Sequence, residues 1–213
     1  MLDNKDMSVA LCDQLIEMAA QDERIVVVEA DSLTVTGMDR FRKQYPDRTF
    51  NVGIAEANMI GVAAGLANCG KIPLVSTFTP FATRRCFDQI VISASYSRLS
   101  LKIIGLNPGV TTELNGGTHM SMEDVGIMRT IPEMTIVEPV DVFQLQRSLP
   151  EIVHTPGVVY LRLFKGRATK IYEEDCPFTF GKGNVLTEGD DIAIFTSGIM
   201  TQYALDAAAI LEK

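Results

Sequence analysis

Side chains that can hold a ligand or move a proton follow a series of short apolar runs in this sequence. The carboxyl group of Glu56 could act as a general acid or base, and the imidazole of His119 could donate or accept a proton. Phe78 and Phe81 could stack on a flat heterocycle, and the guanidinium group of Arg162 suits an anion. These residue types would suit proton transfer beside an aromatic binding surface.

Each candidate also has a purely structural interpretation. Glu56 would lie in the first turn of a helix, where the helix dipole favours a carboxylate. His119 could cap a local turn, and aromatic residues spaced like Phe78 and Phe81 usually belong to a core. Asp31, after the first apolar run, could cap a loop, and Arg162 could form an ion pair. The residue types alone leave both interpretations open.

The elements that would position these side chains alternate along the chain. Apolar, β-branched runs typical of buried parallel strands cover 24–30, 50–54, 72–77, 101–106, 134–139 and 157–163. Amphipathic stretches predict helices near 7–20, 56–69, 80–97, 120–129 and 141–151. The alternation predicts an α/β fold with a doubly wound, mostly parallel sheet. Ligands bind such sheets beyond the carboxyl ends of the strands, so the candidates should gather at one edge.

A change of composition after Arg162 predicts a domain boundary. We expect one domain over 1–165 and a polar linker with Gly, Pro and charges over 166–181. Two short runs and a helix at about 199–212 would then begin a second α/β domain over 182–213. This second unit is expected to be the truncated start of a domain, because it is too short to cover a sheet on both faces.

Composition excludes several classes of function. A net charge of −8 and a sequence pI near 4.8 argue against a nucleic-acid-binding surface. No apolar run approaches the length of a membrane span and no leader pattern is present, so a cytoplasmic location is expected. Dinucleotide, P-loop and serine-hydrolase motifs are missing. Cys12, Cys69, Cys86 and Cys176 lack metal-ligand spacing, so no metal site is expected on this chain.

Several longer motifs resemble those of transketolases. The motifs are ADS at 30–32, FNVGIAEANMIGVAAGLA at 50–67, STFTPFATRRCFDQI at 76–90, GGTHMSMEDVGIMRTIPEMTIVEPVD at 116–141 and VVYLRL at 158–163. The resemblance covers residues 7–165 in order, and TSGIMTQYALDAAAILEK at 196–213 is similar to the opening of that family's C-terminal domain. The chain most resembles the C-terminal subunit of two-subunit bacterial transketolases, and the resemblance implies the pyrimidine-binding fold of thiamine diphosphate enzymes.

The resemblance implies a role for each candidate. Glu56 matches the glutamate that bonds N1′ of the cofactor's pyrimidine ring and activates the cofactor. Phe78 and Phe81 match the aromatic pocket of that ring, and Asp31 matches an aspartate near the thiazolium ring. His119 matches a histidine that faces the substrate. The remaining candidate, Arg162, matches an arginine that binds the anionic end of the sugar.

Departures from the family pattern affect sugar recognition. Asn107 stands where a histidine is usual, and Asn115 stands where the G-E-D-G-x-T-H segment carries an acid. Near Ser8 the usual arginine of A-T-R-x-A is replaced. Asn107 and Asn115 are therefore expected to contact substrate in an unusual way, and standard sugar phosphates are expected to be poor substrates.

The resemblance also implies partners. The G-D-G…N motif that binds the diphosphate through Mg²⁺ or Ca²⁺ is missing, so an N-terminal transketolase subunit should supply it. Helix 56–69 would face a subunit contact, which suggests a dimer. We expect an enzyme that transfers a two-carbon ketol unit in sugar metabolism, for example in the pentose phosphate pathway. The alternatives are the β component of a 2-oxoacid dehydrogenase, a deoxyxylulose phosphate synthase, or a non-catalytic assembly subunit.

Overall fold

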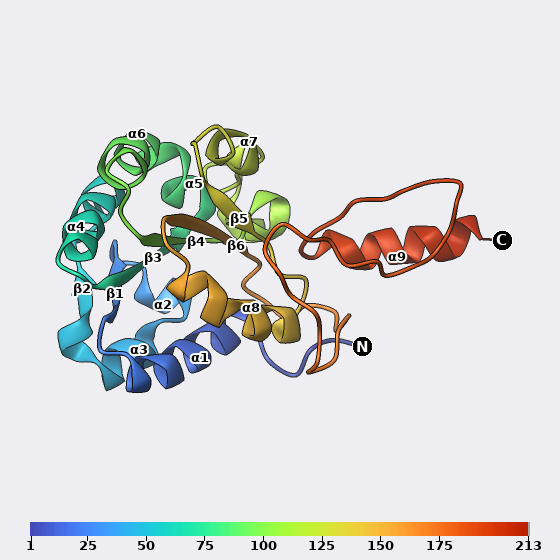
Figure 1. Ribbon diagram of the computed structural model, residues 1–213, viewed down its shortest axis with the longest axis horizontal. Coiled ribbons are helices and arrows are strands. Elements are labelled where there is room, and N and C mark those ends of the chain that lie inside the picture. Colours follow the sequence, from blue (N-terminus) through green and yellow to red (C-terminus); the bar gives the residue numbers. More distant parts are fainter. Residues whose placement is uncertain (213) are drawn as a thin grey trace.

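The computed structural model describes residues 1–212, which contain one six-stranded sheet (Figure 1). The strands are β1 (Ile25–Glu29), β2 (Thr49–Asn51), β3 (Ile72–Phe78), β4 (Leu101–Leu106), β5 (Thr135–Val137) and β6 (Val158–Leu163). All neighbouring strands are parallel, in the order β2-β1-β3-β4-β6-β5. The predicted parallel sheet and all six predicted strand positions are confirmed.

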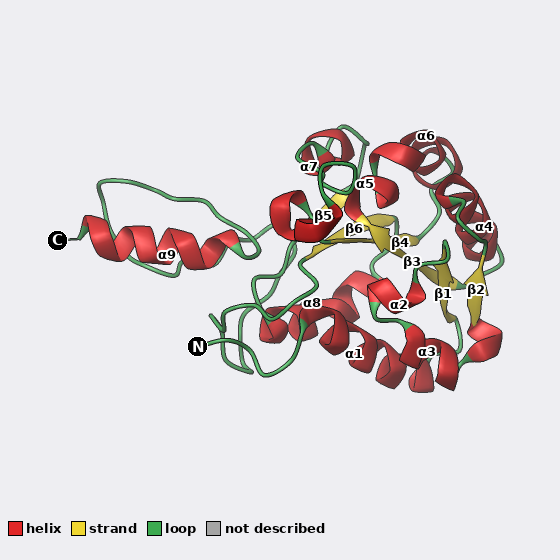
Figure 2. Ribbon diagram, turned by 180° about the vertical axis from the view of Figure 1, so that it is seen from behind, coloured by secondary structure: helices red, strands yellow, loops and turns green. Residues whose placement is uncertain are grey.

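Helices cover both faces of the sheet (Figures 1 and 2). One face packs against α1 (Met7–Gln21), α2 (Leu33–Thr36), α3 (Asp39–Gln44) and α8 (Val142–His154). The other face packs against α4 (Glu56–Asn68), α5 (Thr79–Ala82), α6 (Phe87–Gln89) and α7 (Asp124–Met128). Successive strand residues point to opposite faces, so Val27 belongs to the first core and Val28 to the second. Burial on both faces explains why the central strands are almost continuously apolar.

Two predicted helices differ from those observed. The stretch expected to form one helix at 80–97 is broken into α5, a 3-10 turn (Arg84–Cys86), α6 and a π-helical segment (Ile90–Tyr96). The break lies at Thr83, whose φ of −121° and ψ of −90° are not helical and whose hydroxyl donates to Thr79 O. The helix expected from 120 begins only at Asp124, so His119 lies in a turn before it.

The C-terminal segment departs further from the prediction. Helix α9 (Met200–Leu211) forms where a helix was expected. The two short runs predicted to begin a second strand-and-helix unit within 182–198 are not strands, because no neighbouring strand pairs with them in the described chain. Their large side chains are solvent-exposed instead, including Ile192 and Phe195. Helix α9 and this segment extend away from the sheet (Figures 1 and 2).

The helices differ from membrane-spanning helices. None of those within residues 1–212 combines the length and the apolar character that crossing a lipid bilayer would require.

Candidate functional site

The parallel sheet brings the ends of β1, β3, β4 and β6 to one edge, and the N-terminus of α4 opens there as well. Asp31 follows β1, Phe78 ends β3, Asn107 follows β4 and Arg162 lies near the end of β6. The candidates predicted from sequence therefore share this edge, as expected for ligand sites in such sheets.

Glu56 is the first residue of α4 and is buried, with 6% of its surface exposed. The helix N-terminus stabilises a carboxylate at this position because unpaired backbone N–H groups point toward it. Glu56 Oε1 accepts a hydrogen bond from Arg85 Nη1 at 2.9 Å. Among the described residues, no group donates a hydrogen bond to Glu56 Oε2. The carboxylate thus has one oxygen engaged and one available.

Phe78, Phe81 and His119 form a cluster of three rings. Phe78 ends β3 and Phe81 lies in α5, which begins directly after it with Pro80 near its start. The Phe78 and Phe81 centroids are 6.1 Å apart with the rings edge to face. The imidazole of His119 contacts both rings, at centroid distances of 4.9 and 5.0 Å. The two phenylalanines and the histidine, which the sequence motifs present separately, thus form one cluster.

Two arginines that were not among the predicted site residues adjoin this cluster. The guanidinium carbon of Arg85 lies 3.9 Å from the Phe81 ring centroid, which is a cation–π distance, while Nη1 bonds Glu56. Its neighbour Arg84 pairs with Glu123 at 2.8 Å. The signal in the sequence was the Arg-Arg pair one helical turn after Phe81.

A small cavity of about 150 Å³ lies beside the end of β1, lined in part by Glu29, Asp31, Arg42 and Asn51. Asp31 has a φ of 59° and accepts a hydrogen bond from Asn51 Nδ2 at 3.2 Å. Glu29, which was not among the predicted site residues, is fully buried, and burial raises the pKa of its carboxyl group. Asp31 thus follows β1 and Glu56 begins α4.

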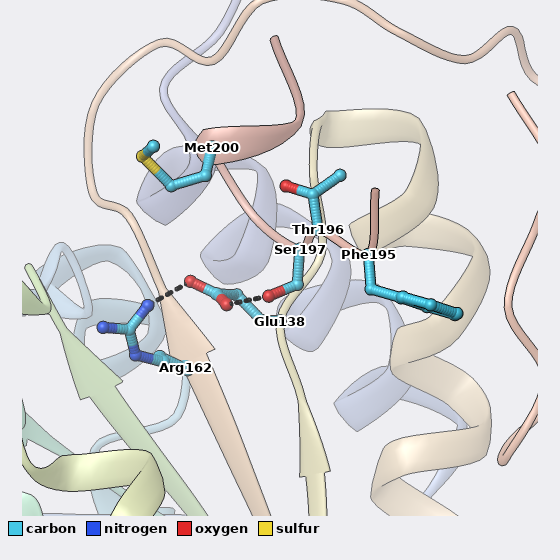
Figure 3. A pocket seen from close by; sticks show the side chains of 6 residues that line it. All are labelled: Glu138, Arg162, Phe195, Thr196, Ser197 and Met200. Carbon is cyan, nitrogen blue, oxygen red and sulfur yellow. Dashed lines mark hydrogen bonds and ion pairs between the residues drawn. The ribbon is translucent and has the colours of Figure 1, made fainter. Parts of the chain in front are cut away.

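Arg162 is held by two carboxylates. Its Nε donates to Asp124 Oδ2 at 2.7 Å, and its Nη1 donates to Glu138 Oε1. Figure 3 shows that Glu138 also bonds the hydroxyl of Ser197, which links the end of β6 to the C-terminal segment. A cavity of about 460 Å³ opens here, lined by Glu138, Arg162, Phe195, Thr196, Ser197 and Met200.

The C-terminal segment approaches Glu138 closely at Gly198. This residue has a φ of +55°, and a Cβ atom there would lie 2.5 Å from Glu138 Oε1. Glycine is therefore required for the contact, because a larger residue would displace the carboxylate that binds Arg162. The contact makes residues 195–200 one wall of the larger cavity.

The two asparagines have different surroundings. Asn107, with a φ of 54°, accepts a hydrogen bond from Lys165 N at 3.1 Å, so its carbonyl oxygen holds the loop that follows β6. Asn115 is exposed at the end of a 3-10 segment (Gly109–Asn115), and Gly116 follows with a φ of 70°. The structure does not bring Asn115 into the ring cluster.

The side chains that commonly bind metals are dispersed. Within 1–212 no group of three or more His, Cys, Asp or Glu side chains is arranged to hold a metal ion, and the four cysteines are free thiols.

Comparison with known proteins gives a consistent result. The family model described as "Transketolase, pyrimidine binding domain" matches residues 3–170. The chain is 52% identical over 92% of its length to the 6-deoxy-6-sulfo-D-fructose transketolase subunit SqwH of Clostridium sp. (strain MSTE9). It is 34% identical over 94% of its length to one subunit of the apulose-4-phosphate transketolase of Phocaeicola vulgatus. These matches span 61% and 65% of the two relatives, so the chain covers less than two thirds of either.

A solved structure agrees with the sequence matches. It is described as "Split gene transketolase, inactive beta4 tetramer", and it superposes with a TM-score of 0.86 at 38% identity. The superposition covers 97% of this chain and 67% of that chain. The likeness therefore includes the C-terminal segment as well as the sheet.

Proposed function

The chain belongs to the transketolase family through its pyrimidine-binding domain, and on that premise we propose that it is the C-terminal subunit of a thiamine diphosphate-dependent transketolase. The reaction would transfer a two-carbon ketol unit from a ketose to an aldose. The observation that carries the proposal is the buried carboxylate of Glu56 at the start of α4, which Arg85 links to the ring cluster of Phe78, Phe81 and His119.

The residues present fit the pyrimidine half of the cofactor. Glu56 keeps one oxygen available as an acceptor, and the faces of Phe78 and Phe81 suit a flat, amino-substituted ring. Asp31, at the end of β1, would face the cationic thiazolium ring. When bound, thiamine diphosphate supplies a nucleophilic carbon at thiazolium C2 that carries the ketol unit between the two sugars.

This chain's own side chains would then perform three tasks. Glu56, which is itself buried, would hold a proton at ring nitrogen N1′. His119, held by contact with both phenyl rings, would donate or accept a proton at a substrate hydroxyl. Arg162 lines the larger cavity and would bind the anionic end of the sugar there in place of its present partner Glu138.

A partner subunit would complete the active site. Cofactor diphosphate and its Mg²⁺ or Ca²⁺ would bind to an N-terminal transketolase subunit carrying G-D-G…N. The exposed glycines Gly61 and Gly65 on α4 support a close subunit contact on this helix, because a Cβ atom added at either would meet no other part of the described chain. A homodimer formed through this domain is part of the proposal.

The donor sugar is proposed to differ from the usual pentose phosphates. The names of two relatives specify 6-deoxy-6-sulfo-D-fructose and apulose 4-phosphate. Asn115 replaces an acid of the family's sugar-reading loop, which supports a changed pattern of hydroxyl recognition. We therefore place the donor among ketoses with an anionic terminal group, with 6-deoxy-6-sulfo-D-fructose as the first candidate.

Reconstitution tests the proposed function. The chain would be copurified with the N-terminal subunit, loaded with thiamine diphosphate and Mg²⁺, and assayed for ketol transfer from 6-deoxy-6-sulfo-D-fructose and from xylulose 5-phosphate. We expect transfer from the sulfonated donor to exceed transfer from xylulose 5-phosphate, and Glu56→Gln to remove both. Activity of the chain without its partner, or submicromolar binding of the cofactor by the chain alone, would contradict the two-subunit site.

A further inference from the structure

We propose that Arg85 is a positioning residue for Glu56. It fixes Oε1 of the carboxylate and leaves Oε2 as the oxygen that faces the pyrimidine. The inference rests on the proposed function and adds to it a residue that neither the motifs nor the comparisons assign.

The geometry connects Arg85 to two residues of the proposed ring site at once. Its Nη1 lies 2.9 Å from Glu56 Oε1, and its guanidinium carbon lies 3.9 Å from the centroid of Phe81. Glu56 is buried, whereas the side chain of Arg85 is 48% exposed. The arginine therefore reaches from the rim of the site to a carboxylate inside it.

A guanidinium group is suited to this task because it is planar and carries several fixed donors. It can stack flat on Phe81 while one N–H points at Glu56, and the stacking limits rotation of the donor. An ammonium group could pair with the carboxylate but could not hold the same orientation. The shape of the side chain thus matters as much as its charge.

The local backbone separates the two adjacent arginines. The helix breaks at Thr83, and Cys86 Sγ donates to Phe81 O at 3.1 Å across the 3-10 turn. From this turn Arg84 reaches Glu123 and Arg85 reaches Glu56. At this turn one guanidinium therefore pairs with each of two carboxylates.

Fixing one oxygen of Glu56 determines where the other lies. A carboxylate at a helix start can rotate about its side-chain torsions, and each rotation would move the acceptor away from a ring held by Phe78 and Phe81. With Oε1 bound to Arg85, the direction of Oε2 is set before any ring arrives. Loss of Arg85 should then weaken ring binding and slow activation without unfolding the chain.

The experiment compares three variants of the full chain. Arg85→Gln removes the charge and the stacking, Arg85→Lys keeps the charge only, and Arg98→Gln removes an exposed guanidinium just before β4, at the opposite edge of the sheet. The first readout is the affinity of each chain for 4-amino-5-hydroxymethyl-2-methylpyrimidine, from NMR titration. The second is deuterium exchange at cofactor C2 in the assembled complex at saturating cofactor, and the third is the unfolding midpoint.

We expect Arg85→Gln to weaken binding of the pyrimidine fragment about 3- to 10-fold, which is the effect of losing one hydrogen bond. Deuterium exchange at C2 should slow by about 10- to 100-fold, which is the usual cost of a misplaced catalytic group. Arg85→Lys should retain more exchange than Arg85→Gln, and Arg98→Gln should match the parent chain. Unchanged exchange in Arg85→Gln, or tighter fragment binding, would overturn the inference, as would a lowered midpoint with normal exchange per folded molecule. Normal exchange in Glu56→Gln would instead overturn the proposed function itself.

Discussion

Arg162 Nε donates to Asp124 Oδ2 at 2.7 Å, and the same carboxylate oxygen accepts a hydrogen bond from Tyr160 Oη at 2.8 Å. A second carboxylate, Glu138, binds the other side of the guanidinium group. Two acidic side chains thus surround one arginine, and Asp124 is the more deeply buried. Both the ion-pair and the substrate interpretation of Arg162 depend on this network, because it fixes where the guanidinium points.

Asp124→Asn should destabilise the fold by about 1.5–3 kcal/mol, because it weakens charged hydrogen bonds in a buried place. Chemical denaturation of the purified chain measures this, with Glu138→Gln as the comparison that should lose less stability. Burial and the neighbouring Asp124 carboxylate both raise the pKa of Tyr160, so the pKa of this phenol should fall in Asp124→Asn. An unchanged tyrosine titration and full stability would show that the network is not formed in solution.

Glu56→Gln should slow deuterium exchange at cofactor C2 by about 10²–10⁴-fold or more in the assembled complex, because an amide cannot share a proton with N1′. The free energy of unfolding should change by only about 1 kcal/mol or less, since the partner Arg85 is half-exposed. Exchange kinetics and unfolding curves separate the two effects. A lowered midpoint with normal exchange would mean that Glu56 serves only the start of α4.

Asn115→Asp should raise kcat/KM for xylulose 5-phosphate by about fivefold, because a charged acceptor binds a hydroxyl about 1 kcal/mol more strongly than a neutral one. Steady-state kinetics of the assembled enzyme would measure the ratio between this sugar and the sulfonated donor. Asn68→Asp adds the same charge in the last turn of α4 and serves as the control. Equal effects of both substitutions would exclude Asn115 from sugar recognition.

Lys102 introduces a dependence of stability on pH. Its side chain is fully buried and donates to Ser100 Oγ and to the carbonyl oxygens of Thr155 and Gly157. Burial lowers the pKa of this amine to about 8 from its ordinary value of 10.5. Between these pH values the unfolded chain binds more protons than the folded chain. The contribution of Lys102 to stability should therefore rise with pH from about 8 to 10.5.

Urea denaturation at several pH values in this window can test that expectation. The rise from Lys102 should total no more than about 3 kcal/mol, at about 1.4 kcal/mol per pKa unit, and it should be absent in Lys102→Met. Lys182→Met, which replaces an exposed lysine, should keep the slope of the parent chain. Identical slopes in the parent chain and in Lys102→Met would contradict the shift.

Much of the fold could be predicted from local patterns. Runs such as 24–30 and 101–106 are apolar at nearly every position because helices cover both faces of β1 and β4, and that burial leaves a direct mark on composition. Parallel strands also fix which residues share an edge, so the loops that carry the site could be chosen from the order of the strands alone. The position of Glu56 at a helix start could also be predicted, because the helix boundary follows from the residue pattern of that segment alone.

Local patterns gave the wrong prediction where other contacts, or the lack of them, determined the backbone conformation. The stretch 80–97 has the periodicity of one helix, but the hydroxyl of Thr83 bonds Thr79 O and the chain bends there. Apolar residues between 182 and 198 resemble strands, yet a strand also needs a neighbour, and none pairs with them in the part of the chain that the structure describes. Propensity describes what a segment can form, whereas the hydrogen-bond partners that its groups find, near or far along the chain, select what it does form.

Residue type and order were enough to establish the family, the parallel sheet and the side chains at its carboxyl edge, because these follow from motifs and from the pattern of each segment. The pairing of those side chains depends instead on how the chain packs in three dimensions. Packing placed His119 against Phe78 and Phe81, tied Arg162 to Asp124, and brought Arg85 to Glu56 across 29 positions of the chain. Such contacts join residues that no local spacing relates, since they arise where separate loops meet at the sheet edge.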